Sequence, residues 1–248
     1  MRDQYAGDIS DFLKFALLRA LAADDCSVGV AWYYNKDHDG RADGRHTDYI
    51  LDKKWEAVDK ALREELERFY WRWKADSQER TVGSLERLSF WPNQTSFHGT
   101  REGESVPRFV RDRSDWLQAM ECKLASSKLL FLDPDNGVHH RPTIRHATFD
   151  DVRKLRSSCR ALLLIKFPAF EDHKKQLKTH AESLRNQSDA SMSMTLRTRT
   201  EIRCEACGSV RQLFRWFTLI DYDATLETRF RAFQEKLRLI PGVSAIID

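Results

Sequence analysis

The loop Asp133-Pro134-Asp135-Asn136-Gly137 places two carboxylates and an amide within four residues. These groups accept and donate hydrogen bonds, so they could hold a base, a hydroxyl or a hard cation such as Mg²⁺, and the proline ring stiffens the turn. A predicted strand over 128–132, apolar after Lys128, leads directly into the loop. Ligands of open parallel sheets bind outside the carboxyl ends of the strands. We therefore interpret this loop as the functional centre, against the alternative of a plain Asp-Pro turn.

The two acidic residues of this loop also fit a metal-dependent nuclease. Lys166 ends a later apolar run, and such enzymes combine carboxylates that hold Mg²⁺ with a lysine that positions water. The usual nuclease pattern has an acidic residue two positions before the lysine, where this chain has Leu164. A magnesium-dependent nuclease that uses Asp133, Asp135 and Lys166 stays open as an alternative function.

The C-terminal third carries arginines on two predicted strands. Alternation of apolar and polar residues predicts strands over 192–202 and 212–222, joined as a long antiparallel hairpin. Alternate side chains share one face of a strand, so arginines on a hairpin could bind the phosphates of a nucleic acid. The candidates are Arg197, Arg199, Arg203, Arg211 and Arg215. A charged outer face of an antiparallel sheet is the alternative interpretation.

Cys204 and Cys207 have the spacing of half a zinc site. A tetrahedral zinc ion needs four ligands, and Cys26, Cys122 and Cys159 are isolated in the sequence. We expect a hairpin turn without metal, unless a distant histidine or a second subunit completes the site. Irregularly spaced cysteines, no leader-like segment and no apolar run long enough for a bilayer predict a soluble cytoplasmic protein without a membrane partner.

Helices and buried strands alternate along most of the chain. Apolar residues at helical spacing predict helices over 9–21, 55–73, 114–124, 149–155, 170–184 and 226–237, and Asp8 and Ser114 can cap two of them. Apolar runs predict strands over 28–34, 128–132, where Lys128 precedes the apolar residues, and 161–165, and a short strand is expected at 243–247. The segment 82–107 supports no assignment.

This order predicts a single α/β domain over 1–248 with a Rossmann-like, mostly parallel sheet, a C-terminal antiparallel hairpin and a helical insertion at about 48–80. An apolar share of 41% is enough for one core. The 41 basic residues exceed the 38 acidic ones by three, so net charge alone does not indicate a nucleic-acid partner.

The opening Tyr5-Ala6-Gly7-Asp8-Ile9-Ser10-Asp11-Phe12-Leu13-Lys14-Phe15 resembles the start of the small, J-type bacterial 23S ribosomal RNA adenine-N6 methyltransferases. Those proteins begin with a His-Ala-Gly-Asn stretch followed by Asp-Val-Leu-Lys-His. Asp37 to Arg41 lies where that family places a Thr-His-Ala-Gly loop against S-adenosylmethionine, and Leu132 to Asn136 falls where it carries Asp-Pro-Pro-Tyr. The sequence is closer still to a set of bacterial proteins that share Gly-Asp-Ile-x-Asp-Phe and Phe-Leu-Asp-Pro-Asp-Asn-Gly, a set to which we attach no activity.

The resemblance implies a class I methyltransferase fold that uses S-adenosylmethionine and acts on nucleic acid, with RNA favoured. It implies that Lys14 and His38 border the cofactor together with Asp133, which also orients the target amino group. It also implies that Tyr5 lies near the substrate. The five arginines of the hairpin are substrate-contact candidates from their own pattern, and Asp133, Asp135 and Asn136 are the catalytic candidates.

Three departures from the family bear on the reaction. Asn35 to Gly40 contains one glycine where a cofactor loop usually has two or three, and Phe15 replaces a histidine. Asp135 and Asn136 stand where the family has a proline and the aromatic residue that stacks on a flipped base. A methyltransferase-like scaffold that binds nucleic acid or a partner protein without catalysis is therefore a third hypothesis.

Overall fold

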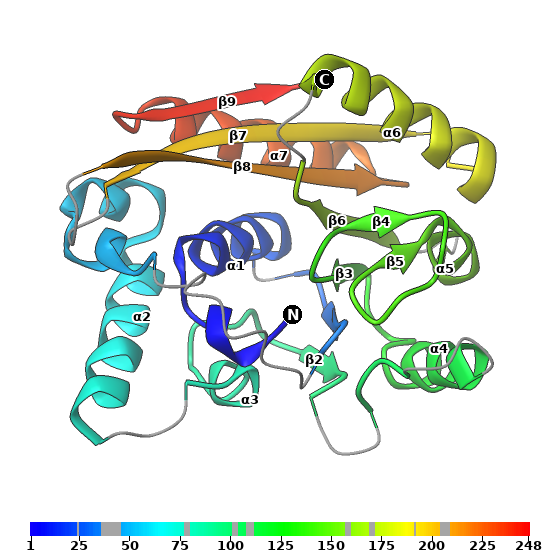
Figure 1. Ribbon diagram of the computed structural model, residues 1–248, viewed down its shortest axis with the longest axis horizontal. Helices are drawn as coiled ribbons and strands as arrows, with labels where there is room; N and C mark the ends of the chain where they lie inside the picture. Colours follow the sequence, from blue (N-terminus) through cyan, green and yellow to red (C-terminus); the bar gives the residue numbers. More distant parts are fainter. Residues whose placement is uncertain are drawn as a thin grey trace.

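The computed structural model describes residues 1–23, 25–35, 46–76, 80–100, 104–107, 112–156, 160–168, 172–190, 192–203 and 209–248, without the side chains of Asp76 and Arg203. These residues form a seven-stranded sheet in the order β2-β1-β3-β6-β8-β7-β9 (Figure 1). A two-stranded sheet made of β4 (Val138–His139) and β5 (Ala147–Thr148) follows the Asp133 loop. The predicted mixed α/β fold is confirmed.

The main sheet has a parallel half and an antiparallel half. The strands β2 (Thr95–His98), β1 (Val28–Trp32), β3 (Leu129–Asp133) and β6 (Ala161–Lys166) run parallel to one another. The antiparallel half contains β8 (Val210–Ile220), β7 (Ser193–Arg203) and β9 (Val243–Ile247). The predicted C-terminal hairpin is therefore present, since β7 and β8 pair along their whole length.

Helices cover both faces of this sheet. One face is covered by α1 (Ile9–Ala22), α2 (Glu56–Asp76) and α7 (Ala224–Arg238), and the other by α4 (Arg113–Lys123), α5 (Phe149–Leu155) and α6 (His173–Ser188). In Figure 1, α1 and α2 lie to the left of β3, and α4 and α5 lie to its right. Successive side chains of a strand alternate, so Phe131 packs toward α1 and Leu132 packs toward α4 and α5.

The helix α1 begins where the sequence predicts. The Asp8 side chain accepts hydrogen bonds from the backbone N–H groups of Ser10 and Asp11, and this satisfies two of the donors that a helix start leaves unpaired. The predicted Ser114 cap is wrong, because α4 begins at Arg113 and its N-cap position is Asp112, two residues before Ser114, without a side-chain cap hydrogen bond. The segment expected to hold an insertion contains η2 (Asp48–Leu51), η3 (Lys53–Trp55) and α2.

The segment 82–107 supplies two elements that the sequence left unassigned. They are α3 (Val82–Leu85) and the edge strand β2, whose Thr-Ser-Phe-His sequence is too short and too polar to stand out. The strand expected over 28–34 ends at Trp32, although the Tyr33 N–H still donates to the Asp133 carbonyl at 3.3 Å. Within the described residues, no helix has both the length and the apolar character needed to cross a membrane.

A buried ion pair fixes the extension that follows the Asp133 loop. The Arg113 guanidinium pairs with the Asp151 carboxylate and donates to the His146 carbonyl at 2.8 Å. The Tyr33 hydroxyl donates to the same carboxylate at 3.3 Å. These contacts connect the end of β1 to β5 and α5, so both sides of the loop rest on rigid elements.

Candidate functional site

A cavity of about 270 Å³ opens at the carboxyl ends of β3 and β6, beside the first turns of α1. We call it the α1 cavity. It brings together residues that the sequence selected from three distant segments: Tyr5, Lys14, Asp133, Asp135, Asn136 and Arg215. His38, Cys204 and Cys207 lie outside the described residues, as does the Arg203 side chain.

Lys14 joins the two motif segments at the floor of this cavity. Its Nζ lies 2.9 Å from Asp133 Oδ2 and 2.5 Å from Asp11 Oδ1, and all three side chains are 1–2% exposed. Burial disfavours the charged lysine, but attraction to the two carboxylates outweighs it and raises the pKa of Lys14 above its ordinary value. Lys14 therefore holds the Asp133 carboxylate in a fixed orientation.

Asp11 has an unusual protonation equilibrium for an aspartate. Its Oδ2 accepts a hydrogen bond from the Gly7 N–H at 2.6 Å. Burial raises the pKa of Asp11 to about 7, although the charge of Lys14 opposes the shift. The buried group of Asp11, Lys14 and Asp133 thus changes its net charge near neutral pH.

The pKa of Asp11 predicts how stability depends on pH. An unfolded aspartate has a pKa of about 3.9, so between about pH 4 and pH 7 the folded protein binds more protons at Asp11 than the unfolded chain. Stability from this group is complete below about pH 4 and is lost as pH rises through about 7. As pH rises from about 4 to about 7, the free energy of unfolding of the wild type is expected to fall relative to that of Asp11→Asn, as measured by urea titration.

The exposed Asp150 provides the control for this measurement. Hydrogen bonds from Lys154 and Arg153 lower the pKa of Asp150. The contribution of Asp150 to the free energy of unfolding is therefore lost as pH falls, whereas that of Asp11 is lost as pH rises. A constant difference between wild type and Asp11→Asn from about pH 4 to pH 8 would contradict the assignment of a raised pKa to Asp11.

The loop after β3 is fixed by contacts on both sides. The Asp135 carboxylate pairs with Arg2 Nε at 2.9 Å, and the Asn136 N–H donates to the Arg145 carbonyl at 2.9 Å. Gly137 has a φ of +90°, and a Cβ at this position would lie 3.0 Å from the Cα of Lys166. Only glycine adopts this turn without strain, so the chain leaves the loop close against β6.

The predicted arginines do not form one surface. Arg215 faces α1, where its Nε donates to Ser10 Oγ at 2.9 Å. In the hairpin, Arg197 is opposite Trp216 and Arg199 is opposite Phe214, so both lie on the face away from α1. Arg197 pairs with Asp248 and Arg199 is exposed. Arg211 is on the same face as Arg215, and is exposed.

Lys166 does not join the acidic residues of the loop. It follows Ile165, which packs toward α1, so its own side chain leaves the opposite face of β6. Its Nζ lies 6.0 Å from the ring centroid of Trp216, and burial lowers its pKa. The lysine that contacts Asp133 is Lys14. In the described part of the chain, no group of three or more metal-binding side chains is present.

A second cavity, of about 470 Å³, lies at the carboxyl end of β2. We call it the His98 cavity; Glu104 and Trp116 also line it. His98 is 2% exposed, and neither of its ring nitrogens has a hydrogen-bond partner among the described residues. Burial lowers the pKa of His98 although Glu104 opposes this shift, so the imidazole is neutral at pH 7. Sequence reasoning missed this residue because β2 gave no clear pattern.

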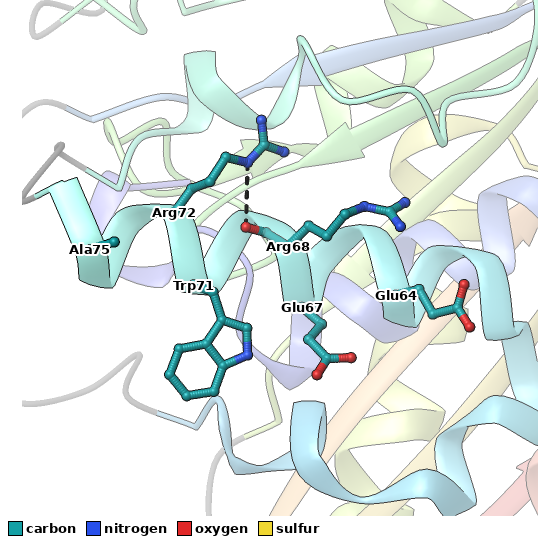
Figure 2. Close-up of a pocket in the computed structure, with 6 residues that line it drawn as sticks. All are labelled: Glu64, Glu67, Arg68, Trp71, Arg72 and Ala75. Atoms are coloured by element: carbon teal, nitrogen blue, oxygen red, sulfur yellow. Dashed lines mark hydrogen bonds between the residues drawn. The ribbon is translucent and has the colours of Figure 1, made fainter.

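A third hollow lies on α2 and has a different character. Figure 2 shows that its lining residues all come from this one helix, and the Trp71 ring extends from it beside Glu67. Arg72 Nε donates to the Arg68 carbonyl at 3.3 Å. A single helix forms a shallow surface, and no strand end contributes to it. We therefore place the candidate site at the α1 and His98 cavities.

Comparison with known proteins gives evidence on the fold. No family model matches the sequence, and no curated protein matches it. A solved structure, protein LPL1258 from Legionella pneumophila str. Philadelphia 1, of the family model DUF519, is similar with a TM-score of 0.50 and 13% identity. The match covers 98% of this chain and 97% of that chain. At this identity, the likeness extends to the α/β fold alone, over nearly the full length of both chains.

Proposed function

We propose that this protein transfers a methyl group from S-adenosylmethionine to an amino group of a nucleobase, with RNA as the favoured substrate. The observation that carries the proposal is the 2.9 Å contact between Lys14 Nζ and Asp133 Oδ2. These residues belong to the two motifs on which the resemblance to adenine-N6 methyltransferases rests, and their contact supports a shared site. The parallel sheet with its antiparallel hairpin is the fold that the resemblance implies.

The strand order indicates where a cofactor would bind. From β1 the chain first adds β2 on one side and then β3 on the other, so the crevice between β1 and β3 is a topological switch point, the usual ligand position in such sheets. The α1 cavity lies on one side of this point, at the end of β3, and the His98 cavity lies on the other, at the end of β2. Both cavities therefore lie at the carboxyl ends of the parallel strands, the α1 cavity on the face that α1 covers and the His98 cavity on the face that α4 covers.

The His98 cavity has suitable groups for the nucleoside part of the cofactor. Neither ring nitrogen of His98 has a partner among the described residues, and a hydroxyl or a ring nitrogen of adenosine would supply one. The Trp116 ring, 5.6 Å from the His98 ring, is buried and forms an apolar wall of this cavity. The bound cofactor would supply an activated methyl group.

The α1 cavity would hold the acceptor base. The Asp133 carboxylate, oriented by Lys14, can accept a hydrogen bond from an exocyclic amino group and so fix the direction of its nitrogen lone pair. The nitrogen becomes positively charged as it takes the methyl group, and a nearby carboxylate stabilises that charge.

The first test is binding of S-adenosylhomocysteine. A ligand that binds only the folded protein raises its melting temperature, so we expect stabilisation of several degrees at saturating concentration. The apparent affinity for S-adenosylhomocysteine, taken from the dependence of the melting temperature on ligand concentration, should fall at least tenfold in His98→Ala. The exposed control Asp150→Asn should not change it. Transfer of labelled methyl groups to unmethylated ribosomal RNA should then be detectable, and Asp133→Asn should reduce it about a hundredfold or more.

Two results would overturn the proposal. The nuclease would be indicated by three results together. S-adenosylmethionine and S-adenosylhomocysteine give no stabilisation, Mg²⁺ gives a stabilisation that Asp133→Ala abolishes, and the protein cleaves nucleic acid. No nucleoside response but binding of RNA that survives Asp133→Ala would indicate a scaffold without catalysis.

A further inference from the structure

Phe167 is an aromatic residue of the α1 cavity to which the sequence assigned no role. It directly follows β6 and is half-buried, with its side chain on the α1 side of the sheet. The Cζ atom of Arg215 lies over the ring, 4.6 Å from its centroid, so the two side chains form a cation–π contact. We call these two residues the Phe167–Arg215 pair.

The pair is held in place from two elements. Arg215 Nε donates to Ser10 Oγ at 2.9 Å, and Arg215 Nη1 donates to the Phe214 carbonyl at 2.8 Å. These bonds fix the guanidinium plane between α1 and β8. A flat and rigid surface binds another flat group at a low cost in conformational entropy.

The rest of the cavity suits one flat group that bears an amino substituent. Asp133 and Asp135 offer acceptors on one side, and the Phe167–Arg215 pair is on another. The volume of about 270 Å³ lies just below the range of about 300–1,000 Å³ typical of drug-sized ligands, so it suits a single heterocycle.

Asn136 is exposed and stands where the resembled family has its stacking aromatic, so the loop itself offers no aromatic ring. We propose that the Phe167–Arg215 pair, which the end of β6 and the strand β8 supply, is the surface on which the acceptor base stacks. Arg215 then contacts a base, in place of the phosphate contact that the sequence predicts for it. This inference rests on the proposed function, since it assigns the base-binding surface of that reaction.

The test uses fluorescence of a single-stranded RNA oligonucleotide that carries 2-aminopurine at its centre, with S-adenosylhomocysteine present. Stacking quenches this fluorophore. Phe167→Leu should weaken binding about 5- to 160-fold, as expected for the loss of one base–aromatic stack, and should abolish quenching, whereas Phe167→Tyr should retain both. Phe214→Leu is the matched control, because the Phe214 ring packs on His173, on the face away from α1.

Arg215→Lys separates stacking from phosphate binding. Lysine keeps the charge and loses the planar group, so quenching should fall if Arg215 stacks on the base. If Arg215 contacts a phosphate, lysine should preserve the affinity and its salt dependence.

Some outcomes distinguish this inference from the function on which it rests. Methyl transfer by the wild type with unchanged quenching in Phe167→Leu would overturn the inference and leave the function standing. Loss of quenching in Phe167→Leu without any response to S-adenosylhomocysteine would leave the base site standing and overturn methyl transfer. No quenching by the wild type would overturn the inference directly.

Discussion

Lys14→Met is expected to lower the free energy of unfolding by about 3–5 kcal/mol at pH 7, because it removes the counter-charge of two buried carboxylates. Taking away one partner of a buried ion pair leaves the other charged in a medium that solvates it poorly. Methionine has a similar shape to the lysine stem, so lost packing contributes little. Urea denaturation of both proteins measures the difference.

Lys54→Met is the matched control for this substitution. Lys54 pairs with Asp52 at 2.9 Å, the same distance as Lys14 to Asp133, but these side chains are 28% and 44% exposed. An exposed pair contributes about 0–1 kcal/mol, so the loss in the control should be small. Equal losses of the free energy of unfolding in Lys14→Met and Lys54→Met would show that burial does not determine how much the Lys14 ion pairs stabilise the fold.

The pH dependence of the Lys14→Met effect is part of the expectation. Without the lysine, the pKa of the buried Asp11 carboxyl group rises further, and stability falls as pH rises through that value. The difference from the wild type should shrink below about pH 4, where the carboxyl groups of both the folded and the unfolded chain take up protons. In a Lys14→Met background, adding Asp11→Asn and Asp133→Asn should recover part of the loss.

The sequence predicts the parts of this site that depend on local pattern. The Asp133 loop stood out because a uniformly apolar run ends in Asp-Pro, and α1 stood out because an apolar stripe follows the Asp8 cap. Both follow from rules that act over a few residues. The contact between Lys14 and Asp133 could not be predicted from the residues alone, because it joins positions that are 119 apart in the chain. It required the fold, and the fold required the strand order.

The arginines show why a hairpin face is harder to predict. Odd positions of one strand share a face, but the register between strands decides which positions of the partner lie on it. Here Thr198 is opposite Arg215 and Ile202 is opposite Arg211, so odd residues of β8 share a face with even residues of β7. The sequence between the two strands does not fix this register, and the arginines therefore divide between the two faces.

The strand β2 shows a different limit. An edge strand needs only one hydrogen-bonded neighbour, so its sequence is under weaker constraint than that of a central strand. Thr95 to His98 is short and mixed in polarity, and its parallel pairing with β1 is a tertiary contact. The His98 cavity is formed by that pairing, which explains why sequence reasoning found the α1 cavity and missed its neighbour.

The end of β2 also gives the second large expected effect, for Gly99→Ala. Gly99 has a φ of +111°, and a Cβ at this position would lie 2.1 Å from the Trp32 carbonyl oxygen at the end of β1. Backbone in this region costs a non-glycine residue about 1–3 kcal/mol, and relieving the overlap costs about 1–3 kcal/mol more. We expect a total loss of about 2–6 kcal/mol in the free energy of unfolding.

Gly83→Ala is the control, since Gly83 lies in α3 and a Cβ there would meet no atom within 4 Å. Alanine at an open helical position should change stability by less than about 1 kcal/mol, in the favourable direction. Because His98 precedes Gly99 and pairs with Ala31, any shift that relieves the overlap moves the imidazole. Gly99→Ala should then also weaken stabilisation by S-adenosylhomocysteine. A stable Gly99→Ala protein that binds the nucleoside as the wild type does would show that the backbone at Gly99 accommodates a Cβ beside the Trp32 carbonyl, and would separate His98 from the proposed cofactor site.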